Sequence, residues 1–158
     1  MYKNNNNSNG SNSANGGVNE NLKKMVEITI AKATAFIKEF YYPLYDTERL
    51  EVLNLYKDPS ISIWNGTECQ GLEKIRNLLS EIPKSSHTIE TFDCQPVQSF
   101  PNILPEDIDN PNILITVTGK VLYGTVSTHN FHQTFLLVKD PSNPQSLFIS
   151  YDCIRLTS

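Results

Sequence analysis

The sequence predicts an α+β domain in which three N-terminal helices precede a meandering antiparallel sheet. Two observations lead to this fold class. In the first half of the chain, apolar residues recur every three to four positions in three segments, as on one face of a helix; later they alternate with polar residues, as in strands. The chain has 158 residues, 39% of them apolar, which is enough for one hydrophobic core. We therefore expect one domain over residues 21–158.

Residues 1–20 form a low-complexity tail. Four consecutive asparagines, Asn4 to Asn7, are followed by a mixture of serine, asparagine and glycine with few apolar residues. A segment of this composition cannot bury enough apolar surface to offset the entropy lost on ordering. The sequence therefore predicts that residues 1–20 are disordered.

Two helices are predicted next. The first has an apolar stripe and is expected to end near Pro43; the stripe is Leu22, Val26, Ile30, Ala33 and Ile37. The second is shorter, and Asp46 or Thr47 is its expected N-cap, because short polar side chains accept hydrogen bonds from free N–H groups at a helix start. Each helix is expected to bury an apolar stripe against the sheet.

A short strand over residues 61–64 and a third helix follow. Asn65-Gly66 is a dipeptide typical of tight hairpin turns. The third helix begins after Gly71, has a buried stripe ending at Ile82, and is stopped by Pro83, which cannot continue a helix.

The remaining chain predicts strands. They cover residues 87–97, 113–123, 131–137 and 147–153, with a proline-rich acidic loop over residues 100–111 and a turn over residues 140–143. The strands are apolar on both faces, since the expected outward positions include Leu114, Leu122, Leu136, Val138, Phe148, Ile154 and Leu156. Three helices can cover one face only, so we expect a partner protein on the other. The alternative is a strongly curved sheet whose second face is partly closed by the acidic loop.

Five motifs in order resemble the nuclear transport factor 2-like family. They are residues 36–46 (FIKEFYYPLYD), Trp64-Asn65-Gly66 with Gln70-Gly71, residues 93–97 (DCQPV), residues 130–137 (NFHQTFLL) and residues 152–156 (DCIRL). The resemblance covers residues 22–156. It implies a cone-shaped domain, with three helices packed on a curved antiparallel sheet, that works as one half of a dimer in nucleocytoplasmic transport.

The family has two transport branches. One branch imports the GDP-bound Ran GTPase. Its members carry a carboxylate directly after the tryptophan, and acidic residues in the turn before the Phe-His-Gln motif. This chain has Asn65 at the first position and Gly124 and Val126 in the turn. Neutral side chains cannot replace charged contacts to Ran. The other branch pairs with the large messenger-RNA export receptor. The Trp-Asn-Gly and Asp-Cys-Gln-Pro motifs of this chain resemble those of the export branch. The resemblance therefore favours the export branch, with nucleoporins reached through the heterodimer and a location in nucleus, cytoplasm and nuclear pore.

The resemblance also implies a set of interface residues. They lie on one sheet face that contacts a second domain of the same family: Asp93, Gln95, His132, Thr134, Leu136 and Arg155. Arg155 is expected to meet a carboxylate, because an unpaired buried charge is costly. That carboxylate could lie on the partner, or it could be Asp93 or Asp152 of this chain, or Arg155 could simply be exposed.

Catalysis is the third alternative, because the same fold hosts isomerases and dehydratases. Candidate acids and bases are Asp93, Asp152 and His132, together with Tyr41, Tyr42 and Tyr56. No metal-binding or Ser/His/Asp spacing accompanies them, so we expect a non-catalytic protein with no cofactor and no metal. The net charge of -4 argues against nucleic-acid binding, and no apolar run is long enough to cross a membrane. Cys69, Cys94 and Cys153 are expected to be free thiols.

Overall fold

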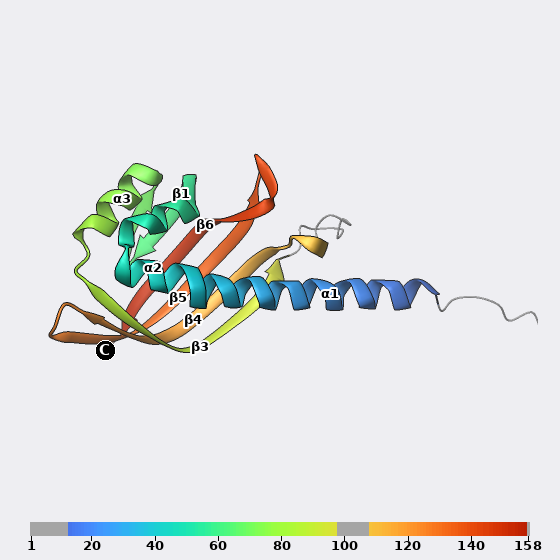
Figure 1. The fold of residues 1–158 in the computed structure, drawn as a ribbon, viewed down its shortest axis with the longest axis horizontal. Helices are drawn as coiled ribbons and strands as arrows, with labels where there is room; N and C mark the ends of the chain where they lie inside the picture. The colour runs from blue at the N-terminus through green and yellow to red at the C-terminus, as the bar shows by residue number, and fades with distance from the viewer. Residues whose placement is uncertain (1–12, 98–107, 158) are drawn as a thin grey trace, which may run out of the picture.

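The computed structural model describes residues 13–97 and 108–157, and it has helices packed on one side of a six-stranded sheet (Figure 1). The helical segments, in order, are α1 (Ser13–Ala35), a π-helical turn (Phe36–Tyr41), α2 (Tyr42–Thr47), a 3-10 helix (Arg49–Leu55) and α3 (Leu72–Glu81). The strands are β1 (Tyr56–Trp64), β2 (Thr67–Gln70), β3 (Ser85–Val97), β4 (Asn112–Tyr123), β5 (Ser127–Asp140) and β6 (Asn143–Thr157). The predicted fold class is confirmed.

Helix α1 differs from the prediction at both ends. It begins at Ser13, so residues 13–20, expected to be disordered, are helical, while residues 1–12 lie outside the described residues. The helix also continues past its expected end through the π-helical turn into α2, where Pro43 occupies the first turn, a position at which proline's missing N–H costs nothing. The domain boundary at residue 21 stays a prediction.

The buried face of α1 is rotated from the predicted stripe. Met25, Thr29 and Ala33 are fully buried, whereas Leu22 and Ile30 are 40% and 51% exposed. In Figure 1 the N-terminal part of α1, which carries Leu22, extends beyond the sheet, whereas Ile30 lies outside the buried face formed by Met25, Thr29 and Ala33. The stripe of α3, in contrast, is confirmed, with Ile75, Leu79 and Ile82 in the core.

The sheet has the strand order β2-β1-β6-β5-β4-β3. Strands β3 to β6 form the predicted antiparallel meander, and β1–β2 form the predicted hairpin, with Asn65 and Gly66 both at positive φ. The expectation of a purely antiparallel sheet is wrong in one place, because β1 runs parallel to β6. After β2 at one edge of the sheet, the chain passes through α3 and reaches β3 at the other edge, so the meander returns to β1 from the far side.

A β-bulge at Ser150 changes which residues of β6 face the core. Leu136 pairs with Tyr151, but the next residue, Leu137, pairs with Ile149, so Ser150 is the extra residue. Beyond it, Asp152 and Ile154 point to the core, and Tyr151, Cys153 and Arg155 point away. The outward positions expected for Ile154 and Leu156 are therefore wrong, since Leu156 pairs with the buried Phe131 and packs against the core.

The core lies between the helices and the inner face of the sheet. Its largest buried side chains include Ile115 of β4, Phe135 of β5, Ile37 of the π-helical turn and Ile75 of α3. The three cysteines are free. Within residues 13–97 and 108–157, no helix combines the length and apolarity that crossing a membrane requires. The expected acidic loop falls mostly outside the described residues.

Candidate partner interface

The six residues expected at an interface lie on one face of the sheet. Side chains alternate between the two faces of a strand, and the core takes Ile115 and Val117 of β4 and Gln133 and Phe135 of β5. The intervening residues therefore point to the opposite side, which we call the outer face. Strand register places on it Asp93, Gln95, His132, Thr134, Leu136 and Arg155.

The outer face is a grid of cross-strand rows. The first row contains Thr91, Thr118, His132 and Arg155. The second row contains Asp93, Thr116, Thr134, Cys153, Ile63 and Glu68. The third row contains Gln95, Leu114, Leu136, Tyr151, Ile61 and Gln70. Residues within a row are direct neighbours. The third row is therefore largely apolar and lies beside a polar second row.

Apolar side chains of the outer face are only partly covered. Leu114 is 38% exposed, and Leu136, Tyr151 and Ile61 are half-buried by their neighbours on the same face. In Figure 1 the helices lie on the other side of the sheet. The outer face of the described residues thus presents apolar surface that no helix covers.

Arg155 has an exposed side chain and forms no ion pair within the described part of the chain. A Cβ at Gly66 would lie 3.5 Å from Arg155 Nη1, so the guanidinium extends over the β1–β2 turn. Asp152 projects to the opposite face of the sheet, and Asp93 stands three strands away. The intrachain partners considered from the sequence are therefore not used, and the guanidinium is available to a second protein.

The inner face holds a buried polar cluster. Asp152 accepts hydrogen bonds from Tyr56 Oη at 2.9 Å and from Gln133 Nε2 at 3.0 Å, and Gln133 Oε1 accepts one from Tyr42 Oη at 2.8 Å. Gln133 Nε2 also lies 3.0 Å from Tyr41 Oη. Four of the sequence-predicted acid–base candidates thus meet here, while Asp93 and His132 lie on the other side of the sheet.

Asp152 has no cation beside it among these contacts. Burial raises the pKa of Asp152 to about 6, although hydrogen bonds from Ser62, Tyr56 and Gln133 oppose the shift. The cavity next to this cluster measures only about 10 Å³. Such a volume holds about one water molecule.

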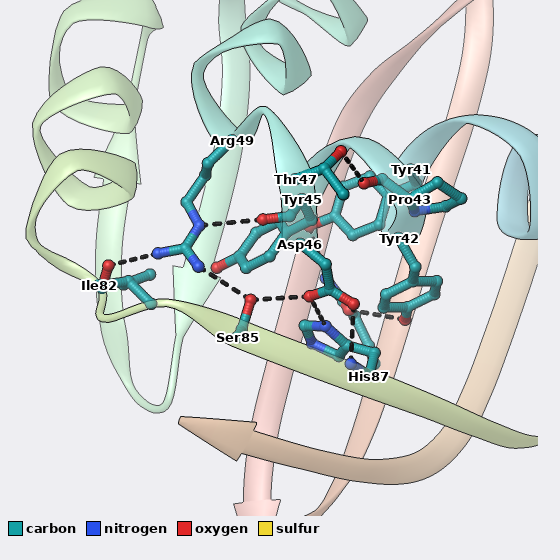
Figure 2. A network of polar contacts seen from close by, with 11 residues as sticks. Tyr41, Tyr42, Pro43, Tyr45, Asp46, Thr47, Arg49, Ile82, Ser85 and His87 are labelled. Atoms are coloured by element: carbon teal, nitrogen blue, oxygen red, sulfur yellow. Dashed lines mark hydrogen bonds and ion pairs between the residues drawn. The ribbon is translucent and has the colours of Figure 1, made fainter. Parts of the chain in front are cut away.

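A second polar network, missed from the sequence, fastens α2 to β3 (Figure 2). Asp46 accepts hydrogen bonds from the His87 backbone N–H and from Ser85 Oγ, both at 2.8 Å, and its Oδ1 lies 2.7 Å from His87 Nδ1. Arg49 donates to Ser85 Oγ at 2.8 Å and to the Ile82 carbonyl. Asp46 therefore joins two elements, and its expected role as a helix cap is wrong.

The turns that would mark a Ran-binding surface are neutral. Asn65 adopts φ 46°, and its Oδ1 accepts a hydrogen bond from the Leu156 backbone N–H at 3.3 Å. In the β4–β5 turn Val126 is 90% exposed. These positions carry no charge with which to pair a basic partner.

Comparison with known proteins identifies the family. The model of the nuclear transport factor 2 (NTF2) domain matches residues 33–156. The chain belongs to this family. NTF2-related export protein 2 of Mus musculus is 32% identical over 137 residues, which are 85% of this chain and 92% of the relative. Nuclear transport factor 2 of Candida glabrata is 31% identical over 121 residues, which are 75% and 86% of the two chains.

Solved structures share the NTF2 fold. Nuclear transport factor 2 from Cryptosporidium parvum superposes with a TM-score of 0.63 at 25% identity, over 85% of this chain and 95% of that one. The C. albicans Mtr2-Mex67 M domain complex gives a TM-score of 0.61 at 19% identity, over 81% and 94%. The cone-shaped fold implied by the sequence motifs is thereby confirmed.

Proposed function

We propose that this NTF2-family protein is a non-catalytic nucleocytoplasmic transport factor that pairs with the NTF2-like domain of a large messenger-RNA export receptor. Pairing would stabilise the receptor and support messenger-RNA export through the nuclear pore. The protein would then act in nucleus and cytoplasm, and nucleoporins would be reached through the heterodimer.

The outer face is the observation that carries this proposal. Its third row joins Leu114, Leu136, Tyr151 and Ile61 across four strands, and helices occupy the other side of the sheet. Removing apolar surface from water contributes about 25 cal/mol per Å² before the costs of association are subtracted. Arg155, on the same face, would add charge selectivity by favouring a partner that presents a carboxylate.

The neutral turns favour export over Ran-GDP import. Identity alone does not separate the two, since an NTF2-related export protein and a nuclear transport factor 2 are 32% and 31% identical to this chain. Asn65 and Val126 occupy positions where the import branch carries acidic groups, and Asn65 is engaged by the Leu156 backbone. An importer would need new carboxylates at both turns, so import of Ran-GDP is the weaker alternative.

The inner polar cluster supports a non-catalytic role. A proton-transfer enzyme needs its acid or base to reach a bound substrate. Asp152 is fully enclosed by Tyr56, Gln133 and their neighbours, and the adjoining cavity of about 10 Å³ is far smaller than an organic substrate. The cluster is therefore suited to holding β5 and β6 against the helices.

The test is a binding experiment with two purified candidates, the NTF2-like domain of an export receptor and GDP-bound Ran. We expect the first to form a stable complex and the second to bind weakly or not at all. Leu136→Glu should abolish the complex, because it would bury a carboxylate against apolar surface, whereas Asn77→Glu on the exposed side of α3 should leave it intact. Binding of Ran-GDP alone would reject the proposal.

A further inference from the structure

A pocket of about 350 Å³ lies between the 3-10 helix, the C-terminal end of α3 and the residues just before β3. It lies among the helices, on the side of the sheet opposite the outer face (Figure 1). Its lining combines an apolar wall, made by Leu50, Leu79 and Ile82, with two cations, Arg49 and Lys84. A volume of this size falls within the range of about 300 to 1,000 Å³ that is typical of small-molecule sites.

Arg49 is held in a fixed position at one side of the pocket (Figure 2). Its Nε donates to the Tyr45 carbonyl oxygen at 3.2 Å, and its two terminal nitrogens donate to the Ile82 carbonyl and, at 2.8 Å, to Ser85 Oγ. The guanidinium also lies over the Tyr45 ring, 4.7 Å from the ring centroid. A guanidinium that is already fixed in this way loses little freedom when it binds a ligand.

These contacts leave part of the Arg49 guanidinium free. A guanidinium has five N–H donors, and three are used here, so one remains on each terminal nitrogen. All three acceptors are neutral, and Arg49 forms no ion pair within the described residues. Arg49 also caps the C-terminal end of α3, where a cation is favourable, but that role uses a single N–H group.

Lys84 supplies the second positive charge. It is exposed and forms no ion pair in the part of the chain that the structure describes. Among the described lining residues the negative charge comes from Asp46, whose two oxygens are already engaged by Ser85 and His87 of β3. The pocket therefore offers two cations, and its carboxylate is turned toward β3.

We infer that this pocket binds a phosphate monoester carried on an apolar or aromatic group. A phosphate monoester is close to doubly charged at neutral pH, which matches two cations, whereas a carboxylate carries a single charge. Two phosphate oxygens accept the remaining N–H groups of Arg49, in the paired geometry that arginine offers to phosphate, and Lys84 approaches the third. The group that carries the phosphate lies against Leu50, which is 50% exposed, and Leu79.

NMR titration of the full chain with phenyl phosphate tests the inference. At about pH 7.5 this probe is mostly a dianion attached to an aromatic ring. Inorganic phosphate provides the charge without the ring, and phenol provides the ring without the charge. We expect shifts at Leu50, Ser80 and Lys84, and about tenfold tighter binding of phenyl phosphate than of either control, because each control lacks one of the two contacts.

A phosphorylated side chain of another protein and a free phosphorylated small molecule share this chemistry. A short peptide with a central phosphotyrosine separates the two sources. Tighter binding of the peptide than of phenyl phosphate would identify a protein segment as the ligand, and equal or weaker binding would identify a small molecule. Both results support the inference, since both require the phosphate to bind in the pocket.

Substitutions separate the pocket from the overall charge of the protein. Lys84→Gln should weaken phenyl phosphate binding about fivefold, whereas Lys74→Gln, at an exposed lysine of α3 outside the pocket, should change it little. Arg49→Lys keeps the charge but loses the paired N–H groups, so it should also weaken binding, and circular dichroism checks that it folds. The inference is overturned if Lys84→Gln and Lys74→Gln have equal effects, or if inorganic phosphate binds as tightly as phenyl phosphate. Shifts confined to the outer face, or absent at millimolar ligand, would also overturn it.

Discussion

His132 and Arg155 face each other directly across β5 and β6, and both are exposed on the outer face. Neither side chain is held by an ion pair within the described residues. The unpaired Arg155 guanidinium therefore favours a partner that brings a carboxylate to this part of the outer face.

Arg155→Ala should therefore weaken the proposed heterodimer strongly. Leaving a desolvated partner carboxylate unpaired typically costs about 2 to 5 kcal/mol. Isothermal calorimetry with the receptor domain measures the loss, and circular dichroism checks that the monomer keeps its helical signal. Arg76→Ala, on the exposed side of α3, is the matched control. Unchanged affinity for Arg155→Ala would remove this residue from the interface.

The buried Asp152 predicts an unusual pH dependence. Its pKa is about 6 in the folded chain and about 3.9 in an unfolded one, so the folded state binds more protons between these values. The contribution of this group to stability is therefore greatest at low pH and falls as the pH rises through 6. Between about pH 4.5 and pH 7.5 the fall amounts to about 2 kcal/mol.

Asp152→Asn should abolish this pH dependence, whatever the variant costs in lost hydrogen bonds. The measurement is urea unfolding of both proteins at the two pH values, since the difference between them cancels the titration of other groups. If the unmodified protein does not lose stability relative to the variant on going to the higher pH, Asp152 is not buried with a raised pKa.

The Asp46 network should have the opposite pH dependence. Burial acts to raise the pKa of Asp46, but hydrogen bonds from His87 and Ser85 outweigh it and hold the pKa below its ordinary value. Its stabilisation is thus present above about pH 4 and is lost in acid. Asp46→Ala should cost about 1 to 3 kcal/mol for each buried donor left unpaired, measured by urea unfolding. Asp58→Ala, at an exposed carboxylate, should change stability little.

Gly119 should tolerate no side chain. A Cβ built there lies 2.2 Å from the Thr88 carbonyl oxygen, beside the bulge that shifts the β3–β4 register after Ile89. Gly119→Ala must therefore move the β3 backbone, and we expect a clearly lower melting temperature. Gly16→Ala is the contrasting substitution, since nothing lies within 4 Å of its Cβ and alanine favours the helix by about 0.5–1 kcal/mol. Equal effects of the two would argue against the bulge.

Truncation should locate the point where α1 begins to support the fold. Deleting residues 1–20 should leave the melting temperature nearly unchanged, because Gly16, Gly17 and Glu20 are exposed. Deleting residues 1–26 should lower it, because this removes the buried Met25 and the ion pair of Lys24 with Asp109 at 2.7 Å. Thermal unfolding of the two truncations makes the comparison, and a large loss from the shorter deletion would show that residues 1–20 pack on the domain.

Local sequence patterns determined much of the secondary structure of this protein and which side chains it buries. Alternation in β4 and β5 identified their buried residues, Asn65-Gly66 identified the hairpin turn, and the apolar spacing of α3 identified its core face. These features depend on neighbours within a few positions, where backbone preference and burial act together. Placing Leu136 on the outer face followed from the same alternation, whereas His132 was assigned to that face by the resemblance of its motif to the family.

Only the tertiary structure decided the long-range features. The bulge at Ser150 exchanges the faces of Ile154 and Cys153, and periodicity alone cannot reveal one inserted residue in a strand pairing. The parallel pairing of β1 with β6 joins residues far apart in sequence. The burial of Met25 in place of Leu22 depends on where the sheet lies beneath α1, and the bonds of Asp46 to Ser85 and His87 depend on where β3 passes α2. Each is fixed by which surfaces meet when the chain folds, and the sequence near each residue does not contain that information.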